Sequence, residues 1–139
     1  MTFLADEQIS PRVARALGVM GQPVYHVNDI EELGRGAKDP IILPYCGKFD
    51  TVLVTLDRRI LRTPHLRALL SEYEVAAFFV RSQRKGSPDP WVIFKTLVKQ
   101  WETIVRIAER EERPFAKMVR PQGAIRSVKW RRGGKSRRT

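Results

Sequence analysis

The order of hydrophobic and polar residues along the chain predicts strands that alternate with helices. The apolar, β-branched run at 51–56 is too short for a helix and is typical of a strand buried on both faces. Similar short runs predict further strands at 2–5, 23–27 and 75–80. Apolar residues at helical spacing predict helices at 10–20, 39–47 and 65–72. This alternation predicts right-handed βαβ units and a parallel sheet that is covered by helices on both faces.

The second part of the chain is expected to extend the same domain. A polar linker at 81–90 leads into the longest helix, at 90–112, whose apolar stripe should pack on the sheet. The stripe consists of Phe94, Leu97, Val98, Trp101, Ile104, Val105 and Ala108. Two short strands are expected at 115–119 and 125–130. With 139 residues, 42% of them hydrophobic, the chain fits one compact domain, which we assign to residues 1–130.

The net charge of +11 is concentrated near the C-terminus. Residues 1–112 carry 16 Lys and Arg against 15 Asp and Glu, whereas residues 113–139 carry 10 Lys and Arg and no acid. The glycine pair and the basic residues of 131–139 cannot bury enough apolar surface to fold, which predicts a disordered tail. A basic segment of this kind indicates a polyanionic partner, with nucleic acid as the first choice. The tail residues expected to contact phosphates are Arg131, Arg132, Lys135, Arg137 and Arg138.

Composition argues against several other classes of protein. The chain has no run of about 18 apolar residues and no charged leader followed by an apolar segment, so we expect a cytoplasmic protein without a membrane partner. Its one cysteine, Cys46, excludes an internal disulfide and a cysteine-based zinc site, and we interpret it as a small buried hydrophobe. His26 and His65 are interpreted as structural, which gives little support to a zinc hydrolase or a catalytic triad.

Three aspartates are candidates for a shared site. Asp6 follows the first predicted strand, Asp57 follows the third, and Asp39 opens a helix. Ligands of open α/β sheets bind at the carboxyl ends of the strands, so we expect the three carboxylates to meet there. Clustered carboxylates repel one another and need a cation, and oxygen ligands favour Mg²⁺ or Mn²⁺. Such an ion suits phosphodiester hydrolysis, so the residues by themselves predict a metal-dependent nuclease.

Each acid also has a structural interpretation. Asp39 precedes Pro40 and would serve as the N-cap of its helix. Asp6 could be a solvated group at a strand end, and Asp57 could cap the turn that follows it. Glu7 is a weaker candidate than its neighbour, because successive residues of an extended chain point in opposite directions. The expected meeting of three acids at one edge is what favours a functional site.

Four short motifs resemble, in their order, those of the PIN-like nucleases. They are Phe3-Leu4-Ala5-Asp6-Glu7, Val24-Tyr25-His26-Val27, Ala37-Lys38-Asp39-Pro40-Ile41-Ile42 and Val52-Leu53-Val54-Thr55-Leu56-Asp57. More narrowly, they resemble the subgroup whose first motif is Asp-Glu, which includes the VapC-type toxins of type II toxin–antitoxin pairs. The resemblance covers residues 2–80. It implies an α/β fold, namely a three-layer α/β/α PIN-like sandwich with a central, mainly parallel sheet.

The resemblance also implies an activity and a set of residues. The activity is Mg²⁺- or Mn²⁺-dependent cleavage of single-stranded RNA, held in check by a cognate antitoxin protein. Asp6, Asp39 and Asp57 would be metal ligands, Glu7 a ligand or a base that orients water, and Thr55 a hydrogen-bonding support. The basic pair Arg58-Arg59 is expected to contact the RNA. The subgroup often has a further acid at the position of Arg59, and this chain departs from it there.

Two other functions are left open by the sequence. A PIN-like module that binds RNA without cutting it is compatible with Arg59 in place of an acid. A phosphoacceptor receiver domain would share Asp6-Glu7 and Asp57, but it leaves Asp39 unexplained and has Arg120-Pro121 where Lys-Pro is usual. The oligomeric state is also open, and a homodimer is one arrangement that the sequence allows.

Overall fold

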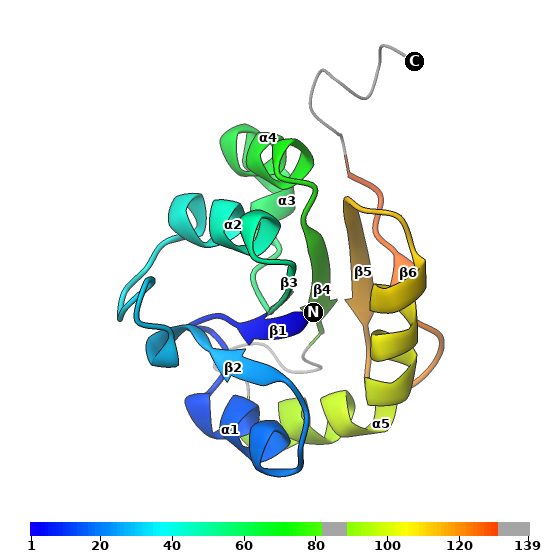
Figure 1. Ribbon diagram of the computed structural model, residues 1–139. Helices are drawn as coiled ribbons and strands as arrows, with labels where there is room; N and C mark the ends of the chain where they lie inside the picture. The colour runs from blue at the N-terminus through cyan, green and yellow to red at the C-terminus, as the bar shows by residue number, and fades with distance from the viewer. Residues whose placement is uncertain (82–88, 131–139) are drawn as a thin grey trace.

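The computed structural model describes residues 1–81 and 89–130, which form a three-layer α/β/α arrangement around one sheet (Figure 1). The strands are β1 (Thr2–Ala5), β2 (Val24–His26), β3 (Thr51–Thr55), β4 (Ala76–Val80), β5 (Phe115–Val119) and β6 (Arg126–Ser127). Their order across the sheet is β2-β1-β3-β4-β5-β6. The first five strands are parallel and β6 is antiparallel to β5. The predicted α/β fold with a mainly parallel sheet is therefore confirmed.

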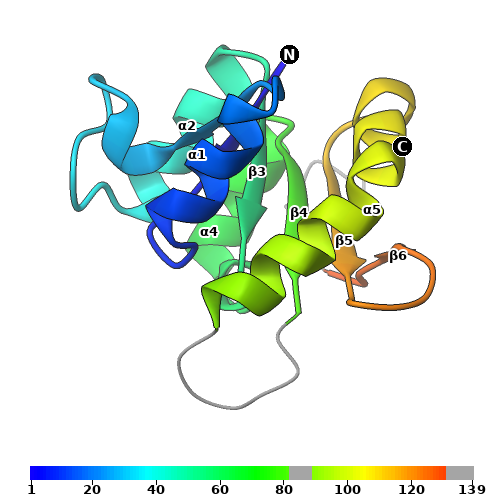
Figure 2. The same ribbon diagram turned by 90° about the horizontal axis from the view of Figure 1, so that it is seen from below.

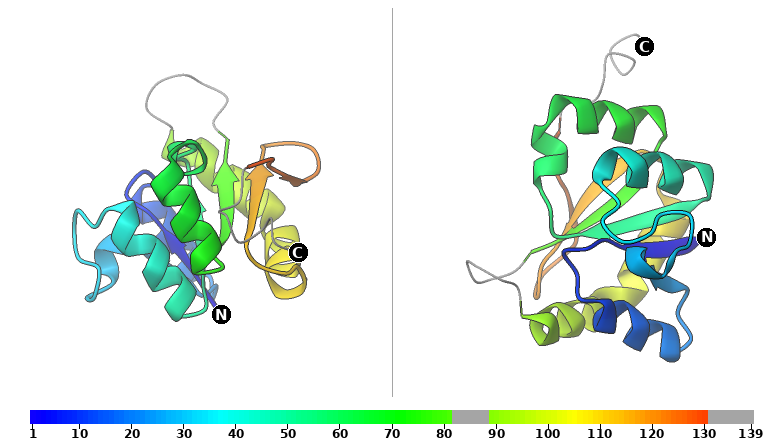
Figure 3. Two further views of the ribbon diagram at one scale, coloured as in Figure 1. Left: turned by 90° about the horizontal axis from the view of Figure 1, so that it is seen from above. Right: turned by 90° about the vertical axis from the view of Figure 1, so that its left-hand side faces the viewer.

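Helices cover both faces of this sheet. They are α1 (Pro11–Val19), α2 (Asp39–Lys48), α3 (Arg59–Arg62), α4 (Pro64–Glu72) and α5 (Pro90–Arg110), with a 3-10 turn, η1 (Val27–Asp29), after β2. Figure 1 and the right-hand view of Figure 3 show α2, α3 and α4 on one side of the sheet and α1 and α5 on the other. Figure 2 shows α1 next to the first half of α5, and the two helices are in contact.

Alternate residues of the central strands supply two hydrophobic cores. Val52 and Val54 of β3 belong to the core beneath α1 and α5, whereas Leu53 between them belongs to the core beneath α2 and α4. Neighbouring residues of a strand point to opposite faces, so a strand that is covered on both sides has consecutive apolar residues, here Val52, Leu53 and Val54. Every residue of β3 is buried, which confirms the central position predicted from its apolar run.

Two side chains with reactive groups have the structural roles expected of them. Cys46 is buried in the core beneath α2. The ring of His26 bridges two backbone groups, with Nε2 2.7 Å from the carbonyl oxygen of Ile9 and Nδ1 3.1 Å from the amide nitrogen of Asn28. Both nitrogens of the ring are therefore engaged in holding the loop before α1 and the turn after β2.

The end of α2 differs from the prediction. Gly47 is expected to end this helix, but the helix continues to Lys48. A Cβ atom at position 47 would lie 2.4 Å from the carbonyl oxygen of Tyr73. Glycine is needed there because the backbone after α4 approaches the helix closely. A glycine near the end of a predicted helix is expected both at a C-cap and at a close packing contact, so the sequence alone does not distinguish the two.

The buried stripe of α5 is rotated relative to the predicted one. Val98, assigned to the stripe, is 51% exposed, while Ile93 and Thr96 are buried. Apolar residues occupy more than one side of this helix, so their spacing alone does not locate the centre of the buried face. The helix also ends at Arg110, two residues before its predicted end.

Other predicted boundaries are only partly matched. The last strand is limited to two residues of the expected 125–130. The strand expected at 23–27 begins one residue later, at Val24, and ends at His26 because Val27 begins η1. The turn after Asp57 contains the unpredicted helix α3. The predicted disordered tail at 131–139 and most of the linker, at 82–88, lie outside the described residues. In the ranges that are described, no helix has both the length and the apolar character required to traverse a membrane.

Candidate functional site

The candidate site lies where the two central strands β1 and β3 end. Ala5 pairs with Val54, and the amide of Asp6 continues the ladder by donating to the carbonyl oxygen of Val54 over 3.3 Å. This register brings Asp6 next to Thr55, the last residue of β3. Strands that run parallel end at the same edge, so the pairing of β1 with β3 accounts for the meeting of two distant sequence motifs.

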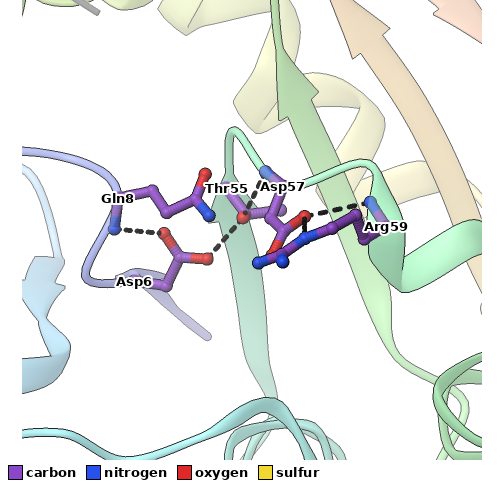
Figure 4. Close-up of polar contacts among 5 residues, drawn as sticks. All are labelled: Asp6, Gln8, Thr55, Asp57 and Arg59. Atoms are coloured by element: carbon purple, nitrogen blue, oxygen red, sulfur yellow. Dashed lines mark hydrogen bonds and ion pairs between the residues drawn. The ribbon is translucent and has the colours of Figure 1, made fainter. Parts of the chain in front are cut away.

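Asp6 is buried, and both oxygens of its carboxylate are engaged (Figure 4). Oδ1 accepts a hydrogen bond of 3.1 Å from the amide of Gln8, and Oδ2 accepts one from the hydroxyl of Thr55. The Thr55 oxygen in turn accepts from the amide of Asp57 at 3.0 Å. Thr55 is fully buried, so its hydroxyl links the two acid-bearing segments in a fixed arrangement.

Asp57 is paired with Arg59, two residues along the chain. Nε of Arg59 donates to Oδ1 over 2.9 Å, and Nη2 donates to Oδ2 over 2.8 Å. The amide of Arg59 also donates to Oδ1, at 3.0 Å, as in a turn closed by an aspartate. The expected turn-capping role of Asp57 is thus present, and it coexists with the position of Asp57 beside Asp6. The guanidinium lies toward solvent, with 74% of the Arg59 side chain exposed.

Asp39 is not the N-cap of its helix. The N-cap position of α2 is Lys38, and Asp39 is the first helical residue, followed by Pro40. Within the described residues the carboxylate of Asp39 accepts no hydrogen bond, and the side chain is half-buried. The capping interpretation is therefore wrong for Asp39. A negative charge in the first turn is still favoured by the helix dipole.

The acidic side chains share one pocket. Asp6, Glu7, Asp39 and Asp57 line a cavity of about 120 Å³, together with the guanidinium-bearing Arg59. Three of these acids come from the ends of β1 and β3, and the fourth comes from the start of α2. Glu7 also accepts a hydrogen bond of 2.7 Å from the amide of Gly36, which fastens the loop before α2 to the end of β1. The structure thus brings together the four acids that the sequence singled out.

The acids of this pocket, which we call the acidic pocket, influence one another electrostatically. The pKa of Asp6 is raised to about 7, mainly by burial and to a smaller extent by the charges of Asp39 and Asp57, while the hydrogen bonds from Thr55 and Gln8 oppose the rise. The pKa of Asp39 is raised by burial and then by the charge of Asp57. The pKa of Asp57 is lowered, because Arg59 hydrogen-bonds its carboxylate. Positive charge in this pocket is therefore favoured, and among its lining residues Arg59 and Lys38 supply it.

The acids of the acidic pocket are suitable ligands for a divalent cation, but their side chains are not arranged to bind one in this structure. All four acids offer oxygen atoms, the donors that Mg²⁺ and Mn²⁺ prefer. Among the residues that the structure describes, however, no three acids, histidines or cysteines are grouped so that they could hold a metal ion. The carboxylate of Asp57 faces Arg59, so metal binding by this set requires Arg59 to move away from Asp57.

Sequence reasoning missed two arginines beside the acids. Arg62 of α3 and Arg81 at the end of β4 line a second pocket, of about 470 Å³, together with Asp57 and the predicted RNA contacts Arg58 and Arg59. The signal for Arg81 was its position directly after a buried strand, the same criterion that selected the aspartates. The other predicted RNA contacts, at 131–139, lie outside the described residues.

Comparison with known proteins gives one match. The model of a family described as a PIN like domain matches residues 1–82, more than half of the chain. The matched segment contains Asp6, Asp39 and Asp57 and runs from β1 to the end of β4, so α5 and β5 lie beyond it. Neither a search of curated proteins nor a search of solved structures found a match.

Proposed function

The chain belongs to the PIN-like domain family, and from this premise we propose that it is a metal-dependent endoribonuclease that cleaves single-stranded RNA. PIN-like domains are often nucleases, which supports a phosphodiester hydrolase in particular. The family match favours this activity over that of a phosphoacceptor receiver domain.

One observation carries the proposal: four carboxylates from three separate segments line the same small pocket at the carboxyl edge of the sheet. Bringing like charges together is unfavourable, and burial of Asp6 adds to the cost. A fold that needed these residues only for stability would gain from replacing them by neutral ones. Strongly perturbed acids in a cleft are accordingly typical of functional sites.

The proposed roles follow from the contacts of each side chain. Asp6, Asp39 and Asp57 would hold Mg²⁺ or Mn²⁺, which supplies positive charge and activates water for phosphodiester hydrolysis. Thr55 fixes the orientation of Asp6 by its hydrogen bond. Glu7 lines the same pocket and is held in place by its hydrogen bond to the loop before α2, so it would orient a water molecule there. Arg59 neutralises Asp57 in the free protein. In the complex a cation would replace Arg59 at Asp57, and an RNA phosphate would replace Asp57 at Arg59.

We assign the biological role of a VapC-type toxin, with a cognate antitoxin as its protein partner. The antitoxin inhibits by covering the acidic pocket. Inserting an arginine or lysine there does this most simply, because the planar fork of arginine pairs with two carboxylate oxygens. The pairing of Asp57 with Arg59 is an internal example of the same contact. A small antitoxin reading frame next to the gene would support this role.

A second candidate function is favoured by that same ion pair. If Arg59 does not leave Asp57, this aspartate cannot bind a metal ion, and the chain would act as a module that binds RNA without cleaving it. The two functions differ in one measurable respect, which is turnover of bound RNA in the presence of Mn²⁺.

The test is cleavage of a fluorescent single-stranded RNA by the purified full chain. We expect cleavage with Mn²⁺ or Mg²⁺, none with a chelator, and none by Asp57→Asn with either ion. Glu102→Gln, on the exposed side of α5, is the matched control for loss of one carboxylate and should cut at the parental rate. Equal cutting by Asp57→Asn and the parent would point to a contaminating nuclease and contradict the proposal. Binding without cleavage by the parent would favour the non-catalytic module.

A further inference from the structure

An arginine-lined pocket adjoins the acidic pocket. Arg58 and Arg62 reach it from the α3 region and Arg81 reaches it from the end of β4, so three side chains from two separate segments converge. β3 and β4 are neighbours in the sheet, which places their carboxyl ends side by side. The pocket measures about 470 Å³, and we call it the arginine pocket.

The two pockets are continuous through shared residues. Gln8, Asp57 and Arg59 line both of them. A ligand that lies over the carboxylate of Asp57 therefore reaches the arginine pocket without leaving the surface of the protein. Beyond the shared residues, the charges differ: the acidic pocket adds three acids and Lys38, whereas the arginine pocket adds three arginines and no acid.

The positive charge of the arginine pocket is only partly offset among the residues that the structure describes, by the charge of Asp57. Within the described residues the side chains of Arg58, Arg62 and Arg81 form no hydrogen bond or ion pair. The acid of this pocket, Asp57, already has both oxygens engaged by Arg59. The segments 82–88 and 131–139 contain no Asp or Glu, so they bring no acidic side chain to the pocket.

We infer that the arginine pocket binds phosphate groups of the RNA strand on one side of the scissile bond. Arginine is suited to this role, because its planar guanidinium presents donors in a fork that matches phosphate oxygens. A run of charges on a protein surface is usually only solvated. Here the arginines converge on a concavity next to the acids, which a solvated face does not require. This inference rests on the proposed function, since it assigns a substrate contact to the same edge of the sheet.

Phosphate contacts of this kind give no sequence preference. They fix the position of the RNA along the protein surface. One phosphodiester group then lies over the acidic pocket, and the neighbouring phosphates lie over Arg62 and Arg81. The inference also explains how Arg59 leaves Asp57: a phosphate that enters beside Asp57 offers the guanidinium an alternative anion, whose two free oxygens also match its fork.

The test measures binding of a fluorescent single-stranded RNA by anisotropy, in chelator, over a series of salt concentrations. The double variant Arg62→Ala/Arg81→Ala removes two phosphate contacts, so the slope of log affinity against log salt should flatten by about 1.4, at about 0.7 per contact on a single strand. A single-stranded DNA of the same sequence should show the same change, because the contacts are to phosphate. The matched control is Arg106→Ala, an exposed position of α5 remote in sequence from both pockets, and it should keep the parental slope.

The side chains of Arg62 and Arg81 are exposed, so the double variant should fold with an unchanged melting temperature. A parental slope in the double variant, or the same flattening in Arg106→Ala, would overturn the inference. So would displacement of the RNA by inorganic phosphate at matched ionic strength, which would identify a site for free phosphate. The proposed function fails separately, if the parent does not cleave RNA with Mn²⁺. In that case the arginine pocket is still a phosphate site if the salt slope of RNA binding depends on Arg62 and Arg81.

Discussion

Arg59 contacts both carboxylate oxygens of Asp57, with Nε 2.9 Å from Oδ1 and Nη2 2.8 Å from Oδ2. The contact places a permanent positive charge in the acidic pocket. The arginine is only two residues from Asp57 in the sequence, and its side chain is largely exposed. The exposure means that water can replace the guanidinium at modest cost. In the proposed metal site, Asp57 would therefore have two alternative partners, its own arginine and an incoming cation.

This competition predicts that Arg59→Ala binds Mn²⁺ more tightly than the parent does. An exposed ion pair contributes up to about 1 kcal/mol, which corresponds to about a fivefold change in the dissociation constant. Isothermal titration with Mn²⁺ measures the difference. Arg62→Ala removes the same charge from the neighbourhood without touching the carboxylate, so it should give a smaller gain. Equal affinities for the parent and both variants would show that Arg59 does not compete with the metal.

The buried carboxylate of Asp6 predicts that stability depends on pH in the metal-free protein. Its pKa rises from 3.8 to about 7 on folding, so the folded state binds more protons than the unfolded state between these values. The free energy of unfolding should therefore fall as pH rises from 4 to 7, by at most about 4 kcal/mol at about 1.4 kcal/mol per unit of pKa shift. Asp57 acts in the opposite sense, since its lowered pKa gives stability that is lost only as pH falls below 3.8.

Urea unfolding in chelator at pH 5 and pH 8 tests this dependence. Asp6→Asn should remove most of the difference between the two pH values and be more stable than the parent at pH 8. Glu102→Gln, with an exposed carboxylate, should leave the difference unchanged. A parent that is more stable at pH 8 than at pH 5 would contradict the burial argument.

The hydroxyl of Thr55 predicts a contrast between two substitutions. Thr55→Val keeps the shape of the side chain and leaves the amide of Asp57 and an oxygen of Asp6 without their partner. A buried polar group that loses its partner costs about 1–3 kcal/mol, so the variant should unfold at lower urea concentration. Thr55→Ser keeps the hydroxyl and loses one buried methyl group, at about 0.8 kcal/mol. The same order should hold for RNA cleavage, and a serine variant worse than the valine variant in both measurements would refute the role of the hydroxyl.

The parts of the site that the sequence predicts are those set by backbone topology. Asp6 and Asp57 each follow a short apolar run, and parallel strands end at one edge, so their meeting follows from pattern alone. The fold follows for the same reason, because alternation of strands and helices restricts the topology. Asp39 was harder to assign, since the sequence around Pro40 is that of a helix start whether the acid is the cap or the first helical residue.

The contacts that the sequence does not predict depend on side-chain conformation and on the order of strands. The pairing of Arg59 with Asp57 is one of several arrangements open to a flexible side chain after a turn. Arg81 joins the arginine pocket because β4 lies next to β3 in the sheet, and this strand order is not evident from the sequence. The rotation of α5, which exposes Val98, is set by packing against α1 and the sheet and not by the spacing of apolar residues.

The proposed toxin role predicts that expression of the chain alone arrests growth and that Asp57→Asn abolishes the arrest. The reason is that the aspartate is a proposed metal ligand, while the arginines of the arginine pocket and the basic residues beyond 130, which are proposed to bind RNA, are not altered by this change. A co-expressed antitoxin should restore growth and, in the purified complex, bury an arginine or lysine against Asp6, Asp39 and Asp57. Colony counts after induction give the first result, and protection of the antitoxin cation from chemical modification gives the second. If Asp57→Asn is as toxic as the parent, the arrest comes from RNA binding by the basic residues, as the non-catalytic module requires.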